Sequence, residues 1–407
     1  MTPRPLDYNP FSSETREDPY PLYAELRQKQ PVFQFGPFHL VSRYDDVVNV
    51  LKNPTLFSSA GVGDPMVGGR PTRTIVNSDP PQHTRLRNIV NRSFTPRMIA
   101  ALEPRIRDIT QNLIDAVSDN GEQRTDLIRD LAVPLPVIVI AEILGVEPER
   151  RADFKRWSDA VVSQVTQPGQ RPTGQFNVIG DGVDGFHQYF EAALEERRRR
   201  PKDDLISALV RAETEDASLT ADEVLAFTAL LLVAGNETTT NLIGNAVLTL
   251  LRRPDQLTKV LADPSLLPNA LEESLRYEAP VQMLFRRTTA ECKIAGVAIP
   301  AGAMVVPLLG SANRDESRYA DPDRFDVMRD SQGHLAFGQG IHFCLGAPLA
   351  RLEARVALGA LLQRLPFLEL ADDKPERVEP FFLRGLKTLA LAFNPHRWRL
   401  APDPTVM

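Results

Sequence analysis

Apolar side chains recur at helical spacing along most of this chain, whereas strict alternation is confined to short stretches. Helices are predicted at residues 20–30, 45–51, 149–164 and 186–200, and residues 102–146 have a helical spacing that Pro134 and Pro136 interrupt. Residues 32–41 alternate around a Gly-Pro pair, which predicts a short β-hairpin. Further strands are predicted at residues 292–299 and 303–309, after an extended apolar stretch that follows Pro280. The pattern therefore predicts a mainly α (α+β) protein with a small β region.

The longest helical pattern runs from residue 220 to about residue 252 and ends before Pro254. Thr220 and Glu223 form a capping-box sequence, in which two side chains satisfy free backbone N–H groups at the helix start. At ~1.5 Å per residue this helix is roughly 50 Å long, enough to cross a domain of this size. Residues 224–233 are apolar on nearly every side, so we expect this half of the helix to be buried.

Two stretches lack periodicity and are rich in glycine and proline. Residues 58–79 are predicted to form a long loop, and residues 167–185 a second one. Loops of more than about a dozen residues inside compact domains are usually functional or disordered. We therefore favour a functional role for the loop at residues 58–79.

Composition limits the partners of the protein. The 407 residues carry a net charge of −6, so no general basic field attracts nucleic acid. Two cysteines, Cys292 and Cys344, provide no disulfide framework. Residues 1–10 lack the apolar core of a signal peptide, and the longest apolar run, 224–235, is too short to span a bilayer. We expect a cytoplasmic protein without a membrane anchor.

The most unusual stretch surrounds Cys344. Residues 337–346 read Phe-Gly-Gln-Gly-Ile-His-Phe-Cys-Leu-Gly, and their glycines allow the backbone to lie close against a flat group. Pro348 marks the first turn of a following helix, whose free N–H groups and dipole favour a thiolate. One alternative is a buried structural cysteine. A dinucleotide-binding fingerprint is disfavoured because Phe343 occupies its sixth position and no acidic residue follows at the required distance.

Six positions of this stretch resemble the haem-binding loop of the bacterial soluble cytochrome P450 monooxygenases: Phe337, Gly338, Gly340, His342, Cys344 and Gly346. The resemblance implies that haem b binds here and that Cys344 is the axial ligand of its iron. Phe337, Gly338, His342 and Gly346 are implied cofactor contacts.

The resemblance extends over almost the whole chain and implies the cytochrome P450 fold in a single domain, residues 1–407. The β-rich part is expected at approximately residues 30–75, 280–310 and 375–400. The helical part is expected at approximately residues 80–278 and 345–365.

The long helix contains an acid beside three threonines, at residues 237–240. This part resembles the oxygen-activating motif of the family. The resemblance implies that Ala234 and Gly235 leave room over the haem, and that Glu237 and Thr238 are the acid and alcohol that deliver protons to dioxygen. From the residues alone an alternative stays open, in which Glu237 pairs with a buried arginine and the threonine hydroxyls bond back to i−4 carbonyls.

Cationic side chains that match the family's ligands of the haem propionates occur in two places. His83 and Arg87 are four residues apart and share one face of a helix. Arg286 matches the third ligand by its distance from Gly296, although the neighbouring Arg287 leaves this assignment open. An arginine suits a carboxylate because its guanidinium binds two oxygens.

A structural motif of the family is matched by Glu273 and Arg276, which lie three apart on a predicted helix. Arg324 is the expected third member. The resemblance implies a buried charged network that fixes the segment leading to Cys344. Removal of one member would leave an uncompensated buried charge.

The residues expected around the substrate are mostly apolar: Leu230, Val233, Val281, Met283, Leu284, Phe382 and Leu383. The substrate is therefore expected to be hydrophobic, and fatty acids, terpenoids, steroids and polyketide-like molecules all remain open. The implied reaction is hydroxylation or epoxidation with one atom of O2.

No flavin or iron–sulfur segment is recognised, so electrons from NAD(P)H are expected through a ferredoxin or flavodoxin-type donor with its reductase. A basic patch for this donor is expected at Arg85, Arg92, Arg351 and Arg355. Two alternatives are a peroxide-driven haem-thiolate peroxygenase and a non-catalytic haem protein that binds a ligand. A haem-free structural protein is a third.

Overall fold

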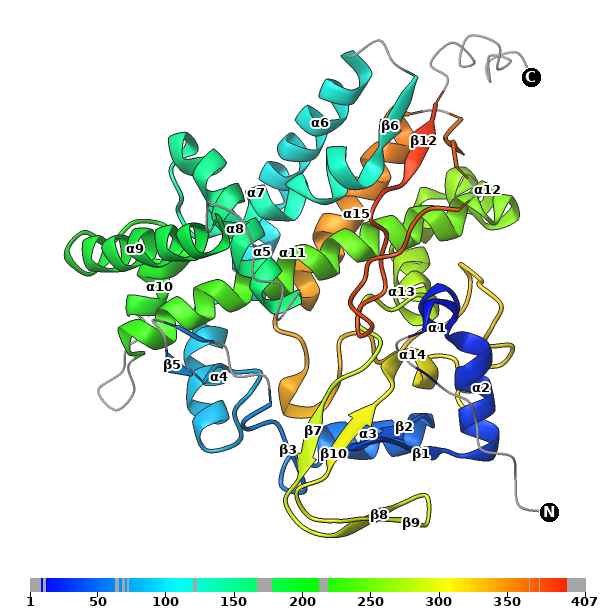
Figure 1. Ribbon diagram of the computed structural model, residues 1–407. Helices are drawn as coiled ribbons and strands as arrows, with labels where there is room; N and C mark the ends of the chain where they lie inside the picture. Colours follow the sequence, from blue (N-terminus) through cyan, green and yellow to red (C-terminus); the bar gives the residue numbers. More distant parts are fainter. Residues whose placement is uncertain are drawn as a thin grey trace, which may run out of the picture.

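The computed structural model describes residues 9, 12–62, 66–67, 70–71, 73–119, 123–166, 178–211, 219–365, 367–372 and 374–393. Helices dominate these residues (Figure 1). The α-helices are α1 (Ser13–Glu17), α2 (Tyr20–Lys29), α3 (Tyr44–Lys52), α4 (Gln82–Ser93), α5 (Pro96–Ala101), α6 (Glu103–Asp119), α7 (Pro134–Ile143), α8 (Arg151–Thr166), α9 (Val178–Arg199), α10 (Leu205–Arg211), α11 (Ala221–Leu251), α12 (Pro254–Ala262), α13 (Leu267–Tyr277), α14 (Leu309–Ala312) and α15 (Ala347–Arg364). Short 3-10 or π turns are η1 (Ile128–Ala132), η2 (Pro148–Arg150), η3 (Pro264–Leu266) and η4 (Gly340–His342).

The strands form one five-stranded sheet, ordered β1-β2-β10-β7-β3, and three small sheets. Their bounds are β1 (Val32–Phe35), β2 (Phe38–Val41), β3 (Phe57–Ser58), β4 (Met66–Val67), β5 (Arg70–Pro71), β6 (Arg124–Asp126), β7 (Arg286–Thr288), β8 (Cys292–Ile294), β9 (Val297–Ile299), β10 (Met304–Pro307), β11 (Glu369–Leu370) and β12 (Ala390–Ala392). β1 and β2 form the predicted hairpin, and β2 pairs in parallel with β10, Leu40 opposite Val306. β6 lies in a segment predicted to be helical and pairs with β12.

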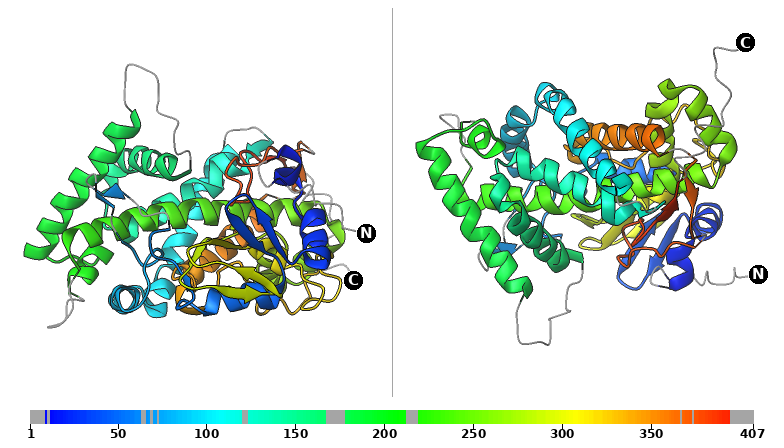
Figure 2. Two further views of the ribbon diagram at one scale, coloured as in Figure 1. Left: turned by 60° about the horizontal axis from the view of Figure 1, so that its bottom comes forward. Right: turned by 90° about the horizontal axis from the view of Figure 1, so that it is seen from above.

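Helix α11 crosses the middle of the molecule, with α8, α9 and α10 grouped around one end (Figures 1 and 2). The predicted capping box is present, because Glu223 N–H donates to Thr220 Oγ1 (3.1 Å) and Thr220 N–H donates to Glu223 Oε2 (3.0 Å). Most side chains from Val224 to Leu250 are buried or half-buried. The helix packs on α7, α8, α13 and α15, which explains why it has no polar face.

The glycines at residues 178–185 support close helix packing, although the sequence predicted a loop there. These residues form the first turns of α9, which packs along α8. A Cβ added at Gly182 would lie 2.5 Å from Ala160 Cβ, and one at Gly185 would lie 2.5 Å from Trp157 Nε1. The absence of side chains therefore allows the two helices to approach. Residues 167–177 of the expected loop lie outside the described residues.

A buried charged network joins α13 to the segment before the Cys344 loop. Glu273 and Arg276 have fully buried side chains and are paired at 2.7 Å. Arg276 also donates to the backbone carbonyls of Asn313 (2.9 Å) and Pro322 (2.8 Å). The network thus holds a segment without regular secondary structure through its backbone.

The third member of this network is Arg329, and the prediction of Arg324 is wrong. Arg329 Nε lies 3.1 Å from Glu273 Oε1, whereas the Arg324 side chain is 62% exposed and faces Asp326 at 3.4 Å. Arg324 contributes only its backbone carbonyl, which accepts from Arg276 Nη2 at 3.2 Å. The hydroxyl of Ser331 completes the shell around Glu273 at 2.6 Å.

Among the described residues, no helix combines the length and the apolar character needed to cross a bilayer.

Candidate active site

Cys344 lies in the short loop between η4 and α15, and Pro348 stands in the first turn of α15 as predicted. The Cys344 N–H donates to the Phe337 carbonyl at 2.9 Å, which closes the loop. Gly340 has a φ of 74°, and a Cβ there would lie 2.6 Å from the Leu51 carbonyl oxygen. The loop can therefore pack on α3 only with glycine at this position.

Burial and the helix start act in opposite directions on the Cys344 thiol. Burial raises its pKa, while the backbone N–H groups of Gly346 and Ala347 and the charge of Arg87 lower it, and the net shift is upward. The sequence predicted that the helix start would favour a thiolate, but in the protein alone desolvation outweighs it. A metal cation at the sulfur would reverse the balance, because coordination replaces the proton.

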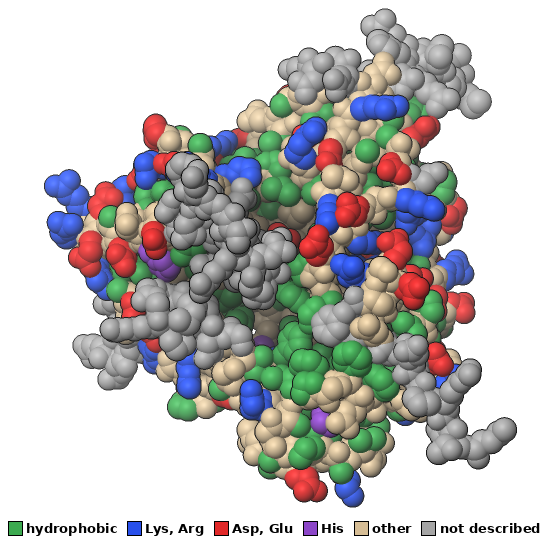
Figure 3. Space-filling view, viewed as in Figure 1, with side chains coloured by type: hydrophobic (Ala, Val, Ile, Leu, Met, Phe, Trp, Pro, Cys, Tyr) green, Lys and Arg blue, Asp and Glu red, His purple; other side chains and the backbone are tan. Residues whose placement is uncertain are grey.

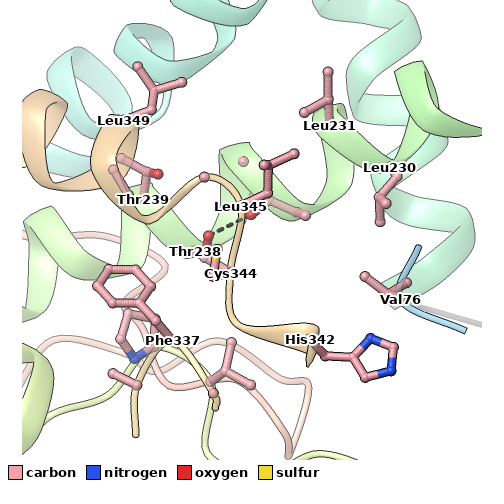
Figure 4. Close-up of a pocket in the computed structure, with 18 of the residues that line it drawn as sticks. Val76, Leu230, Leu231, Thr238, Thr239, Phe337, His342, Cys344, Leu345 and Leu349 are labelled. Carbon is pink, nitrogen blue, oxygen red and sulfur yellow. Dashed lines mark hydrogen bonds between the residues drawn. The ribbon is translucent and has the colours of Figure 1, made fainter. Parts of the chain in front are cut away.

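A cavity of about 300 Å³ opens beside Cys344. Figure 4 shows residues of α11 and the cysteine loop around it, and Figure 3 shows hydrophobic side chains near a hollow in the middle of one face. Predominantly apolar side chains from many segments line it, among them Ile75, Phe94, Ile140, Ile143, Phe227, Leu230, Leu231, Leu242, Val281 and Leu284. Such a cavity suits a hydrophobic ligand.

Three of the seven predicted substrate residues line this cavity: Leu230, Val281 and Leu284. The other four are outside its described lining. Met283 and Phe382 belong to an apolar cluster with Tyr20 and Tyr23, and Val233 packs against the main core. Leu383 forms an isolated β-bridge with Val281 but is not part of the described lining. Sequence analysis missed Ile140 and Phe94 because nothing in their helical spacing indicates which partner they face.

The expected oxygen-site residues on α11 divide between the cavity and its surroundings. Ala234, Gly235 and Thr238 line the cavity that contains Cys344. Thr238 Oγ1 donates to the Ala234 carbonyl at 2.6 Å, the back-bonded geometry that the sequence left open. Its oxygen lone pairs remain available as acceptors. Glu237 is half-buried and is not part of the described lining.

Arg286 is buried in β7, whereas Arg287 is exposed, because neighbouring residues in a strand face opposite sides. Arg286 Nη1 donates to the Phe285 carbonyl at 2.8 Å. Burial lowers the pKa of Arg286 to about 10, and the structure gives it no ion pair among the described residues. The placement favours Arg286 over Arg287 as a ligand of a buried anion.

Further cationic groups lie near Arg286. Arg87 lines the cavity, and burial lowers its pKa. The ring of His83 lies 4.4 Å from that of His342, centroid to centroid, and His83 Nε2 is buried with no hydrogen-bond partner among the described residues. Burial and the charge of Arg87 lower the pKa of His83. Desolvated donors of this kind need a polar partner, and an anionic ligand would provide one.

These residues fit haem, which combines a flat apolar body, two carboxylates and a central iron. Cys344 offers the sulfur, and the apolar walls suit the macrocycle. Arg87, Arg286 and His83 offer donors to the carboxylates. Phe337, Gly338, His342 and Gly346 also line the cavity.

Glu353 of α15 was not anticipated from the sequence. Its side chain lines the cavity, is only 2% exposed, and has Oε2 without a hydrogen-bond partner among the described residues. Burial raises its pKa to about 8. A helical position between Leu352 and Ala354 carries no sequence signal for this environment. A polar group of this kind is suited to hold an ordered water molecule.

Replacing Glu353 by glutamine should stabilise the protein in a pH-dependent way. Between the ordinary pKa near 4.5 and the folded value near 8, the unfolded chain releases a proton that the folded chain retains, so stability falls as pH rises. At ~1.4 kcal/mol per pKa unit, the variant should gain on the order of 3 kcal/mol at pH 7 and little near pH 4.5. Thermal melts across this range test it, with the exposed Glu149→Gln as control. A gain in stability that does not depend on pH would contradict the raised pKa of Glu353.

The expected basic patch is largely neutralised by ion pairs. Arg351 binds Glu272 through two contacts of 2.7 and 2.8 Å, and Arg355 binds Glu103 at 2.8 Å. Arg85 pairs with Glu223 at the start of α11. Arg92 is exposed. The four arginines thus do not form a surface of uncompensated positive charge.

A family model, a relative and two solved structures are similar to this chain. A family model described as Cytochrome P450 matches residues 2–393. Cytochrome P450 monooxygenase PikC of Streptomyces venezuelae is 42% identical over 411 residues, covering 98% of this chain and 95% of the relative. The structure of CYP109Q5 from Chondromyces apiculatus superposes with a TM-score of 0.87 at 46% identity, covering 95% of this chain and 98% of that one. CYP109E1 from Bacillus megaterium in complex with testosterone gives 0.84 at 39% identity, covering 93% and 99%.

The coverage is nearly complete in every comparison, and the similar structures confirm the fold expected from the sequence. The matching family model, the similar folds and the cavity that contains Cys344 all lead to the same family. The chain belongs to the cytochrome P450 monooxygenase family.

Proposed function

We propose that this protein hydroxylates or epoxidises an apolar small molecule with one oxygen atom from dioxygen. The observation that carries the proposal is a single apolar cavity faced by both Cys344 and Thr238. Family membership implies haem iron and O2. Haem b, bound through the Cys344 thiolate, supplies the reductive activation of dioxygen.

The residues around the cavity bind and orient the cofactor and the substrate. Arg87, His83 and Arg286 hold the two carboxylates of the cofactor, since each is desolvated and lacks an ion-pair partner among the described residues. Ala234 and Gly235 have small or no side chains, so α11 leaves space where it passes the cavity. The apolar walls exclude water from the reacting atoms, which limits side reactions.

Thr238 and Glu237 move protons. The Thr238 hydroxyl faces the cavity and is fixed by its bond to the Ala234 carbonyl, so its oxygen is positioned to accept a hydrogen bond from a bound group. Glu237 is the next residue toward the helix start and is half-buried, which suits a carboxylate that exchanges protons with solvent. Glu353 lines the same cavity as Thr238.

The substrate class is supported by the lining and by one relative. The cavity walls are apolar except at Arg87, Thr238, Thr239, His342, Cys344 and Glu353. CYP109E1, which is similar over nearly the whole chain, has been solved in complex with testosterone. We therefore infer that rigid apolar molecules of about steroid size are accepted, with terpenoids, polyketide-like molecules and fatty acids as further classes to test.

Electrons come from NAD(P)H through a separate ferredoxin or flavodoxin-type protein and its reductase. The paired arginines Arg351 and Arg355 lie on α15, directly after the cysteine loop. Because each is already bound to a glutamate, the donor binds by shape and by a few unpaired charges such as Arg92, not by a strong positive field.

The first test is an absorption titration of the purified ferric protein with steroids, terpenoids, macrolides and fatty acids. We expect at least the steroids to shift the Soret band toward high spin by displacing iron-bound water. A normal haem spectrum that no compound shifts would contradict the proposed substrate class. A colourless protein after expression with haem precursors would contradict the proposed function itself.

Replacing Thr238 by alanine should uncouple electron use from product formation. The cavity-facing hydroxyl is lost while the apolar walls stay, so NAD(P)H oxidation should continue and product should fall by roughly 10²-fold, the lower range for a lost acid–base group. The matched control is Thr228→Ala, because Thr228 makes the same back-bond to the Val224 carbonyl (2.9 Å) but lies outside the described lining. Product and peroxide are measured per electron consumed. Unchanged coupling in the Thr238 variant would favour a peroxide-driven enzyme or a non-catalytic haem protein.

A further inference from the structure

Asp79 connects the start of α4 with the end of β3. Its Oδ1 accepts from the Ser59 N–H at 2.9 Å, and its Oδ2 accepts from the Ser58 hydroxyl. Asp79 stands just before α4, where an acid commonly caps a helix. Here the carboxylate makes no capping bond, since the Asp79 backbone carbonyl, not its side chain, accepts from the His83 N–H at 2.8 Å. Capping therefore does not explain this side chain.

Ser59 continues the connection to the cysteine loop. The Ser59 side chain is buried, and its Oγ lies 3.1 Å from His342 Nε2. The His342 ring also makes an edge-type contact with the ring of His83, with 4.4 Å between centroids. In Figure 4 the His342 ring extends away from Cys344, toward Val76. These contacts thus join the end of β3, the start of α4 and η4 around the half-buried imidazole of His342.

The charge arrangement gives a second, independent argument. Among the described residues, Asp79 is the acid whose charge raises the pKa of both His83 and Arg286. β3 pairs with β7 so that Ser58 lies opposite Arg287, which brings Ser59 and Asp79 beside Arg286. One fixed carboxylate therefore offsets the desolvated donors that the haem carboxylates also meet.

We propose that Asp79 and Ser59 are positioning residues of the haem-carboxylate site, with Asp79 fixing Ser59 and the Ser59 hydroxyl fixing the His342 ring. The inference rests on the proposed haem site and adds two residues that touch neither iron nor substrate. Groups that orient the direct ligands of a metal typically contribute about 10- to 100-fold to its affinity or to activity, and we expect a similar contribution here. Replacing either residue should therefore increase the rate at which the protein loses haem.

The experiment measures haem transfer from the holoprotein to excess apomyoglobin. Ser59→Ala should speed haem loss by about 10-fold, as expected for a lost orienting group. Ser58→Ala is the matched control, since Ser58 also touches Asp79 but not His342, and it should lose haem at nearly the parent rate. Unfolding melts of the haem-loaded variants should show that Ser59→Ala remains folded.

Asp79→Asn adds a readout that a merely structural role would not move. Removal of a negative charge near the haem favours the reduced state, so the reduction potential should shift to a more positive value, together with faster haem loss. If this variant does not fold, the rate of haem loss from Ser59→Ala alone tests the proposal. Parent-like haem loss in Ser59→Ala would overturn the proposal, whereas a parent protein that binds no haem would overturn the proposed function instead.

Discussion

Replacing Cys344 by serine should reduce product formation to background and remove the long-wavelength Soret band that a thiolate ligand gives the ferrous carbonyl complex. A serine hydroxyl in this half-buried loop does not become an anion at neutral pH, so the proposed thiolate ligand of the iron would be lost. The loop itself should persist, because its geometry depends on Gly340 and on the Cys344 N–H bond to Phe337. Carbon monoxide difference spectra and product analysis measure both effects.

Cys292→Ser is the matched control. Cys292 is half-buried in β8, where its backbone pairs with Ile299, and it does not line the cavity. This variant should keep the spectrum and the turnover of the parent. A Cys344→Ser protein that retained the thiolate-type band would show that the sulfur of Cys344 is not the ligand.

Replacing Glu273 by glutamine should destabilise the protein by about 3–5 kcal/mol, the usual cost of breaking a buried ion pair. Arg276 would remain fully buried and charged, with only carbonyl partners. A loss of this size is a large part of the ~5–15 kcal/mol that holds a typical protein folded. Denaturant unfolding and the yield of haem-loaded protein measure it.

Two arginine variants separate the expected network from the observed one. Arg324→Gln should leave stability nearly unchanged, because the side chain is exposed, and surface pairs contribute at most about 1 kcal/mol. Arg329→Gln should cost more, since Arg329 contacts Glu273 and donates to the backbone carbonyls of Ala320 and Asp321. A severe loss in the Arg324 variant with none in the Arg329 variant would restore the assignment made from the sequence.

Local patterns in the sequence correctly predicted those features in which the interacting residues are close together in the chain. The capping box at Thr220 and the hairpin at residues 32–41 involve neighbouring residues, and both are present. The choice between Arg286 and Arg287 stayed open in the sequence, and the structure favours Arg286 because alternation in β7 buries it and exposes Arg287. The cysteine, the alanine and glycine of α11 and Thr238 come together in one cavity as the motifs indicated.

The errors share a physical cause, which is tertiary packing. Arg324 and Arg329 stand five residues apart in a segment without periodicity, so no pattern shows which side chain turns inward. Glycines at positions 182 and 185 suggested a loop, yet they allow α9 to approach α8. The environment of Glu353 depends on elements far away in sequence. Such features follow from the arrangement of helices and not from their local propensities.

The parallel pairing of β2 with β10 has a consequence for biosynthesis. Leu40 lies opposite Val306, so most of the chain must leave the ribosome before the central strand of this sheet can be added. Until then the β1–β2 hairpin presents an unpaired edge, and such edges promote aggregation. Contacts between distant residues also slow folding. Production of this protein should therefore profit from slow translation at low temperature and from abundant chaperones.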